Sequence, residues 1–121
     1  MKLFFKGRSI TEDFSSSVIQ ELTTMGYAVE DKEENKMSCD YIFYLLDSSM
    51  DQIYDIIDSV NDGNHFPSKT IFCYSTDSVG DKTFNDHQIK SLKATGKIIE
   101  RNGAHWFNHL DEAFSYLEKQ L

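Results

Sequence analysis

Apolar residues recur along the chain in two alternating patterns, short near-continuous runs and longer stretches with helical spacing. The short runs predict strands at residues 2–6, 27–30, 40–46, 69–75 and 104–107. The run at residues 40–46 has six consecutive apolar or aromatic residues after its Asp, which is typical of a strand buried on both faces of a parallel sheet. The chain therefore alternates between strands and helices.

Four stretches with helical spacing separate or follow these runs. They begin near residues that cap helix N-termini, namely Ser9, Ser49, Thr83 and Asn108. The first and third end at Gly26 and Gly103, where a glycine favours helix termination. The second has isoleucines and a valine at i, i+3, i+4 and i+7, so it predicts an amphipathic helix between the third and fourth strands.

Strands separated by helical patterns predict an α/β fold of three layers, with a flavodoxin/Rossmann-like sheet of about five mainly parallel strands in the order 2-1-3-4-5. Residues 1–121 are expected to form one domain, because a chain of this length has no room for a second core. Only about nine residues link the second and third strands, and residues 31–36 predict a solvated loop that crosses the sheet in an extended form. An antiparallel second strand at the edge is the alternative.

Charge and composition exclude several classes of protein. Twelve Lys and Arg against 20 Asp and Glu give a formal charge of −8, which disfavours nucleic acid and anionic membranes as partners. No apolar stretch approaches the ~20 residues of a membrane span, and no signal-peptide pattern opens the sequence, so we expect a cytoplasmic protein. The histidines lack metal-ligand spacing, and Cys73, within an apolar run, is expected to be a buried thiol; no metal or cofactor is expected.

The predicted sheet places a ligand crevice beyond the carboxyl ends of the first and third strands, where the strand order reverses. The first strand brings Gly7, Arg8 and Ser9 there, and the third brings Asp47, Ser48 and Ser49. A glycine allows close approach of a ligand to the backbone, an arginine binds phosphate or carboxylate, and a helix start favours an anion. In the alternative interpretation, these residues only form a turn, a solvated side chain and a helix cap.

The helix predicted after the third strand carries a series of aspartates at three- and four-residue intervals: Asp51, Asp55, Asp58 and Asp62. This spacing places them on one face, where like charges are mildly unfavourable. Tyr54 and Asp58 lie one turn apart and are expected to flank the crevice beside Asp47. A solvated acidic face is the alternative.

Three segments of the chain carry a resemblance to a known family. Residues 3–8 (LFFKGR) are similar to the opening strand and glycine of nucleoside 2-deoxyribosyltransferase-like proteins. Residues 39–47 (CDYIFYLLD) resemble their Ala-Asp, apolar strand and Asp segment, and residues 105–113 resemble their last strand and helix. The same pattern, including residues 86–103, is also similar to uncharacterised small proteins of large tailed phages.

The resemblance implies a nucleoside or nucleotide ligand and a carboxylate nucleophile that displaces a nucleobase from C1′ of a deoxyribose. It places Asp58 at the nucleophile and Asp47 or Asp51 at the carboxylate that handles the proton of the base. The implied activity is that of a nucleoside deoxyribosyltransferase or a nucleotide N-glycosidase. In the family the nucleophile is a Glu before a small residue and Gly, whereas Asp58 precedes Ser59 and Val60. A catalytically silent binding or protein-interaction module on the same fold is therefore the alternative.

Self-association is also expected. The predicted edge strands are short, which limits edge pairing, so a homodimer should use helix faces that carry Tyr54, Tyr116 and Leu121.

Overall fold

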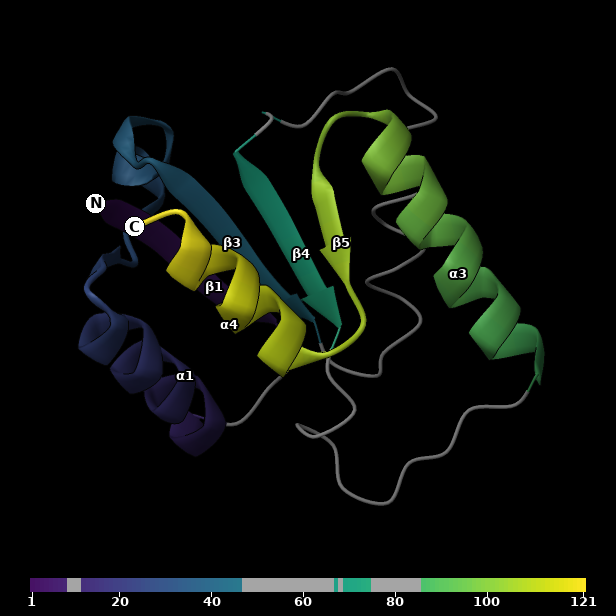
Figure 1. Cartoon of the computed structure of the whole chain (residues 1–121), viewed down its shortest axis with the longest axis horizontal. Coiled ribbons are helices and arrows are strands. Elements are labelled where there is room, and N and C mark those ends of the chain that lie inside the picture. Colours follow the sequence, from purple (N-terminus) through teal and green to yellow (C-terminus); the bar gives the residue numbers. More distant parts are fainter. Residues whose placement is uncertain (9–11, 47–66, 68, 75–85) are drawn as a thin grey trace.

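A computed structural model of the chain describes residues 1–8, 12–46, 67, 69–74 and 86–121. Within these residues, five parallel strands form one sheet in the order β2-β1-β3-β4-β5 (Figure 1). The strands are β1 (Lys2–Arg8), β2 (Ala28–Glu30), β3 (Tyr41–Leu46), β4 (Thr70–Tyr74) and β5 (His105–Phe107). This arrangement confirms the predicted α/β fold and strand order, and the antiparallel alternative for β2 is wrong.

Helices α1 (Glu12–Met25) and α4 (Leu110–Lys119) cover one face of the sheet, which we call the first face. Because side chains alternate along a strand, every second residue of β1 and β3 points to this face, including Leu3, Phe5 and Phe43. These side chains pack against Val18 and Leu22 of α1 and against Ala113 and Leu117 of α4. In Figure 1, α4 lies across the strands with α1 beside it.

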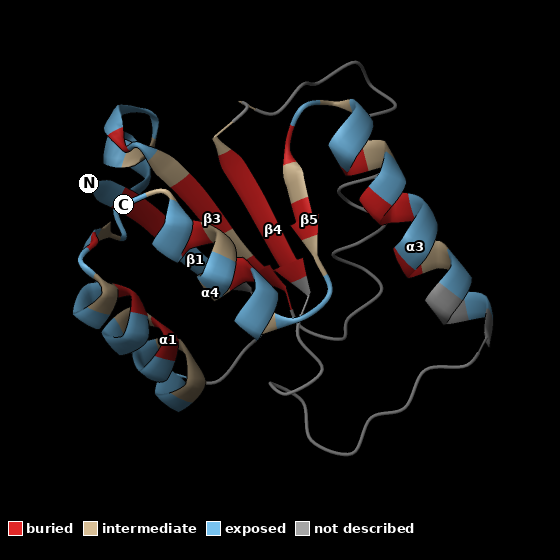
Figure 2. Ribbon diagram, viewed as in Figure 1, coloured by how far each residue is buried: buried red, intermediate tan, exposed pale blue. Residues whose placement is uncertain are grey.

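The opposite, second face is covered by helix α3 (Asp86–Arg101) and by a short 3-10 helix, η1 (Glu33–Ser38). Leu46 and Phe72 of the sheet pack with Leu92 and Ile99 of α3, and Phe4 and Ile42 form a smaller cluster with Cys39 beside η1. Figure 2 shows buried residues along the strands and exposed residues on the outer sides of the helices. The molecule therefore has three layers.

Helix ends follow the predictions where glycine terminates them. Gly26 and Gly103 follow α1 and α3 and have φ of 124° and 88°, a backbone conformation that other residues rarely adopt. The sequence pattern ends the first strand at residue 6, just before Gly7, and that boundary is wrong. Gly7 lies inside the strand and pairs with Leu45 of β3, because pairing with β3 continues through Arg8.

Two further local predictions are wrong. Asn108 does not cap α4, because its amide oxygen accepts a hydrogen bond from Nε1 of Trp106 at 2.9 Å, and His109 takes the N-cap position without a side-chain hydrogen bond. The segment between β2 and β3 is not an extended loop, because η1 forms within it. Both cysteines are buried thiols, as expected for Cys73.

The second helix predicted from the sequence lies outside the described residues. Among the helices that the structure describes, none has the length and apolar character needed to cross a bilayer.

Candidate functional site

The strand order reverses between β1 and β3, at the place that the sequence predicts. The chain leaves β1 for β2 through α1 on the first face and reaches β3 from β2 through η1 on the second face. Arg8 pairs with Leu46, and Gly7 pairs with Leu45, so β1 and β3 end at the same level. In open α/β sheets, a reversal of this kind opens a ligand crevice beyond the carboxyl ends of the strands.

Two of the nine predicted site residues lie in the part of the chain that the structure describes. Gly7 and Arg8 form the last two positions of β1, at the carboxyl edge. Because Gly7 has no side chain, a ligand can approach the backbone of β1 closely at this position. Gly7 does so from within the strand and not from a turn. The other seven lie outside the described residues: Ser9, Asp47, Ser48, Ser49, Asp51, Tyr54 and Asp58.

A polar cluster that no sequence pattern predicts lies two residues back from this edge. Lys6 of β1 and Lys36 of η1 approach the same carboxylate, that of Glu33, with Nζ–O distances of 3.0 and 3.2 Å to different oxygens. The ammonium group of Lys36 also donates to the hydroxyl of Tyr44 at 3.3 Å. Tyr44 pairs with Lys6 across the two strands, so the cluster spans the β1–β3 boundary.

The charges of this cluster stabilise one another. Hydrogen bonds from Lys6 and then from Lys36 lower the pKa of Glu33. The hydrogen bond to Tyr44, followed by that to Glu33, raises the pKa of Lys36 despite its partial burial. The cluster therefore carries two positive charges and one negative charge at neutral pH. The only signal in the sequence is the i, i+3 spacing of Glu33 and Lys36, which is common on solvated surfaces.

An aromatic wall supports the cluster from the sheet. The ring of Tyr44 stacks on Phe72 with a centroid distance of 5.3 Å and meets Phe4 edge-on at 6.3 Å. Lys36 Nζ lies 6.0 Å from the centre of the Phe4 ring, within the range of a cation–π contact. These contacts fix Tyr44 and Lys36 relative to β1 and β3.

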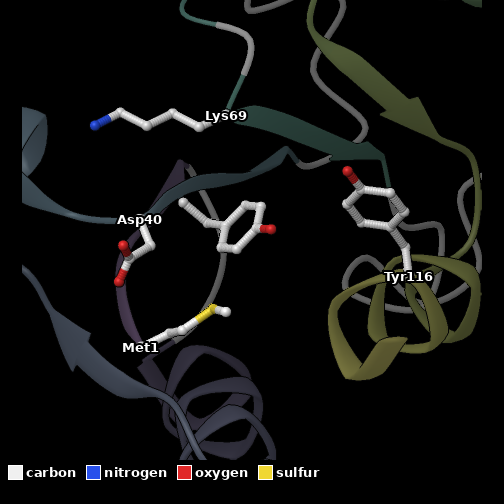
Figure 3. Close-up of a pocket in the computed structure, with 5 residues that line it drawn as sticks. Met1, Asp40, Lys69 and Tyr116 are labelled. Carbon is white, nitrogen blue, oxygen red and sulfur yellow. The ribbon is translucent and has the colours of Figure 1, made fainter. Parts of the chain in front are cut away.

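A pocket of about 350 Å³ lies at the opposite, amino edge of the sheet (Figure 3). Figure 3 shows Met1 and Asp40 on one side and Tyr116, from α4, on the other. The polar side chains of its lining already have internal partners. Asp40 accepts from the backbone N of Lys2, Lys69 donates to the carbonyls of Met37 and Cys39, Tyr41 donates to Gln120, and the Tyr116 hydroxyl pairs with His105. This pocket therefore offers little recognition to a ligand.

A second hollow of about 310 Å³ lies between α1 and α4 on the first face. Phe14, Leu110 and Phe114 provide its apolar lining, and Glu21 and Asp111 add negative charge. Its acidic rim disfavours phosphate and carboxylate ligands. Across the described ranges, no group of three His, Cys, Asp or Glu residues could hold a metal ion.

Comparisons with protein-family models, with curated proteins and with solved structures find no match for this chain.

Tyr116, one of the residues expected at a dimer interface, packs against the core of the first face, and burial raises the pKa of its phenol. Leu121 is half exposed.

Proposed function

We propose that this chain binds a nucleoside or nucleotide in the crevice beyond the carboxyl ends of β1 and β3 and transfers or hydrolyses its N-glycosidic bond. The observation that supports the location is the reversal of strand order between β1 and β3, which end level at Arg8 and Leu46. The chemistry comes from the resemblance of residues 3–8 and 39–47 to nucleoside 2-deoxyribosyltransferase-like proteins.

The reaction consists of two displacements at C1′ of the sugar. A carboxylate oxygen of Asp58 attacks C1′, the bond from C1′ to the base nitrogen breaks, and the base leaves with a proton from Asp47 or Asp51. The result is a sugar ester of Asp58. A second base, or water, then attacks C1′ and gives its proton to the same Asp47 or Asp51, the ester bond breaks, and the carboxylate of Asp58 is regenerated.

A silent binding module is the second candidate, and one observation favours it. Asp58 is one methylene shorter than the glutamate that the family uses, and a misplacement of about 1 Å can cost about 100-fold in rate. Such a chain would retain the crevice without turnover.

Base exchange tests the proposal directly. The protein is incubated with each common deoxynucleoside, or its 5′-monophosphate, and a free acceptor base, and exchange or release of the base is followed by chromatography. We expect Asp58→Ala to lose at least about 100-fold of the rate, whereas Asp62→Ala, which removes another aspartate of the same series, retains it.

The absence of turnover in the wild-type protein would contradict the enzymatic part of the proposal. Thermal unfolding with the same compounds then tests binding, since a ligand at 100 times its dissociation constant stabilises by about 2.7 kcal/mol. Stabilisation without turnover would identify the silent module, and a flat panel would contradict both.

A further inference from the structure

The cluster of Lys6, Glu33 and Lys36 has the geometry of an anion-binding site. Two ammonium groups from separate elements, β1 and η1, converge on the two oxygens of one carboxylate at 3.0 and 3.2 Å. The hydroxyl of Tyr44 lies 3.3 Å from Lys36 Nζ and adds a neutral group beside them. Convergent charged donors of this kind bind carboxylate and phosphate oxygens alike.

The carboxylate that now occupies this position comes from a side chain that can leave it. Glu33 lies in the first turn of η1, and its side chain is 56% exposed, whereas that of Lys36 is 28% exposed. Exposed ion pairs contribute little to stability, so release of Glu33 into water costs little. A phosphate group carries more charge than a carboxylate and has three oxygens to accept hydrogen bonds.

The position of the cluster connects it to the proposed crevice. Lys6 lies two residues before the end of β1, and a strand rises about 3.3 Å per residue, so the cluster is about 7 Å from the carboxyl edge. Both lysines lie on the side of the sheet covered by η1, whereas the acidic hollow between α1 and α4 lies on the other. In a chain with a formal charge of −8, this cluster provides a local net positive charge.

We propose that Lys6 and Lys36 bind the phosphate group of the ligand. In the free protein, the carboxylate of Glu33 occupies the phosphate position between the two ammonium groups, and the ligand displaces it. This inference rests on the proposed function and deepens it, because it selects a phosphorylated substrate, a nucleoside monophosphate, over the free nucleoside.

Calorimetric titration with the four common deoxynucleosides, their 5′-monophosphates and inorganic pyrophosphate tests this inference. We expect at least one monophosphate to bind about tenfold more tightly than its nucleoside, with an affinity that falls as salt rises. Lys36→Met should remove this difference by weakening the binding of the monophosphate. Glu33→Gln, which keeps the size of the side chain, should increase monophosphate affinity about threefold because the competing charge is gone.

Lys32→Met is the matched control, because Lys32 is an exposed lysine next to η1 whose side chain lies outside the cluster. It removes the same charge and should leave the monophosphate preference intact. Equal loss in Lys32→Met and Lys36→Met, or equal affinity of nucleoside and monophosphate, would overturn the phosphate site while the proposed crevice stands.

The pyrophosphate arm separates the two proposals. If pyrophosphate binds in a Lys36-dependent manner while no nucleoside or nucleotide binds, the anion site stands and the proposed function fails. If none of these compounds binds, both are overturned. Because Glu33→Gln and Lys36→Met are expected to move affinity in opposite directions, simple destabilisation of the protein cannot reproduce the pattern.

Discussion

The position of the Trp106 side chain requires a residue without a side chain, Gly96, opposite it. It is the single tryptophan of the chain, lies 8% exposed in β5, and packs onto Gly96 of α3. A Cβ atom at position 96 would lie 2.7 Å from Cδ1 of the indole, closer than real contacts allow. The indole cannot easily move away, because its Nε1 donates to Asn108.

We therefore expect Gly96→Ala to destabilise the protein by about 1–3 kcal/mol, the usual cost of overpacking a core. At an exposed position in a helix, the same change would stabilise the protein by about 0.5–1 kcal/mol. The sign of the effect therefore tests the contact with Trp106. Urea unfolding followed by Trp106 fluorescence measures it. Glu100→Ala, at an exposed position of the same helix, is the control and should change little. A gain in stability from Gly96→Ala would contradict the packing described.

The element η1 is held to the sheet largely through polar contacts. The ammonium group of Lys69, just before β4, donates to the carbonyls of Met37 and Cys39, each at 2.6 Å. None of the residues of η1 is buried, so the hydrogen bonds from Lys69 take the place of an apolar interface. The end of η1 thus depends on a residue 30 positions further along the chain.

Replacement of Lys69 by Met should loosen η1 selectively. Hydrogen bonds from a charged donor contribute about 1.5–3 kcal/mol each, and partial exposure reduces this, so we expect a loss of about 1–3 kcal/mol in unfolding free energy. Amide hydrogen exchange should accelerate in η1 and at Cys39 more than in α4. Lys93→Met, at an exposed position of α3, provides the control. Unchanged exchange in η1 would show that Lys69 does not hold it.

Elements with long apolar patterns were predictable from the sequence, and short ones were not. The apolar run of β3 and the helical spacing of α1, α3 and α4 depend on burial, which leaves a periodic pattern. The six residues of η1 bury nothing and are stabilised by Lys69, so no local pattern reveals them. Similarly, the role of Asn108 is decided by Trp106 Nε1, a competing donor that spacing alone cannot identify.

At the scale of the whole molecule, the location of the candidate site was predictable because it follows from strand order. Alternating strands and helices restrict the sheet to few topologies, and the order found places the reversal between β1 and β3. The convergence of Lys6 and Lys36 on Glu33 was not predictable, because it requires η1 to cross the second face next to β1. The three proposed catalytic residues remain predictions from the sequence: Asp47, Asp51 and Asp58.

A buried phenol between α1 and β2 contacts the last helix, α4, and this contact makes stability depend on alkaline pH. Tyr27, which precedes β2, is 2% exposed and donates to the carbonyl of Leu117 in α4 at 2.6 Å. Burial, followed by the nearby Tyr41, Tyr116 and Asp40, raises the pKa of Tyr27 from its ordinary 10 to about 12. The native state therefore retains a proton that the unfolded state loses above pH 10.

Because the unfolded state binds fewer protons in this range, the free energy of unfolding must fall as pH rises from 10 to 12. The contribution of Tyr27 is fully present below pH 10, and about 1.4 kcal/mol of it should be lost at pH 11. Urea unfolding of the wild-type protein and Tyr27→Phe at pH 8 and pH 11 measures this. At pH 8 the free energy of unfolding of Tyr27→Phe should be about 1 kcal/mol below that of the wild type, because the hydrogen bond is missing. Between pH 8 and pH 11, the free energy of unfolding of this variant should fall by about 1.4 kcal/mol less than that of the wild type. Lysine deprotonation affects both proteins alike, so an equal loss in the two would contradict the raised pKa of Tyr27.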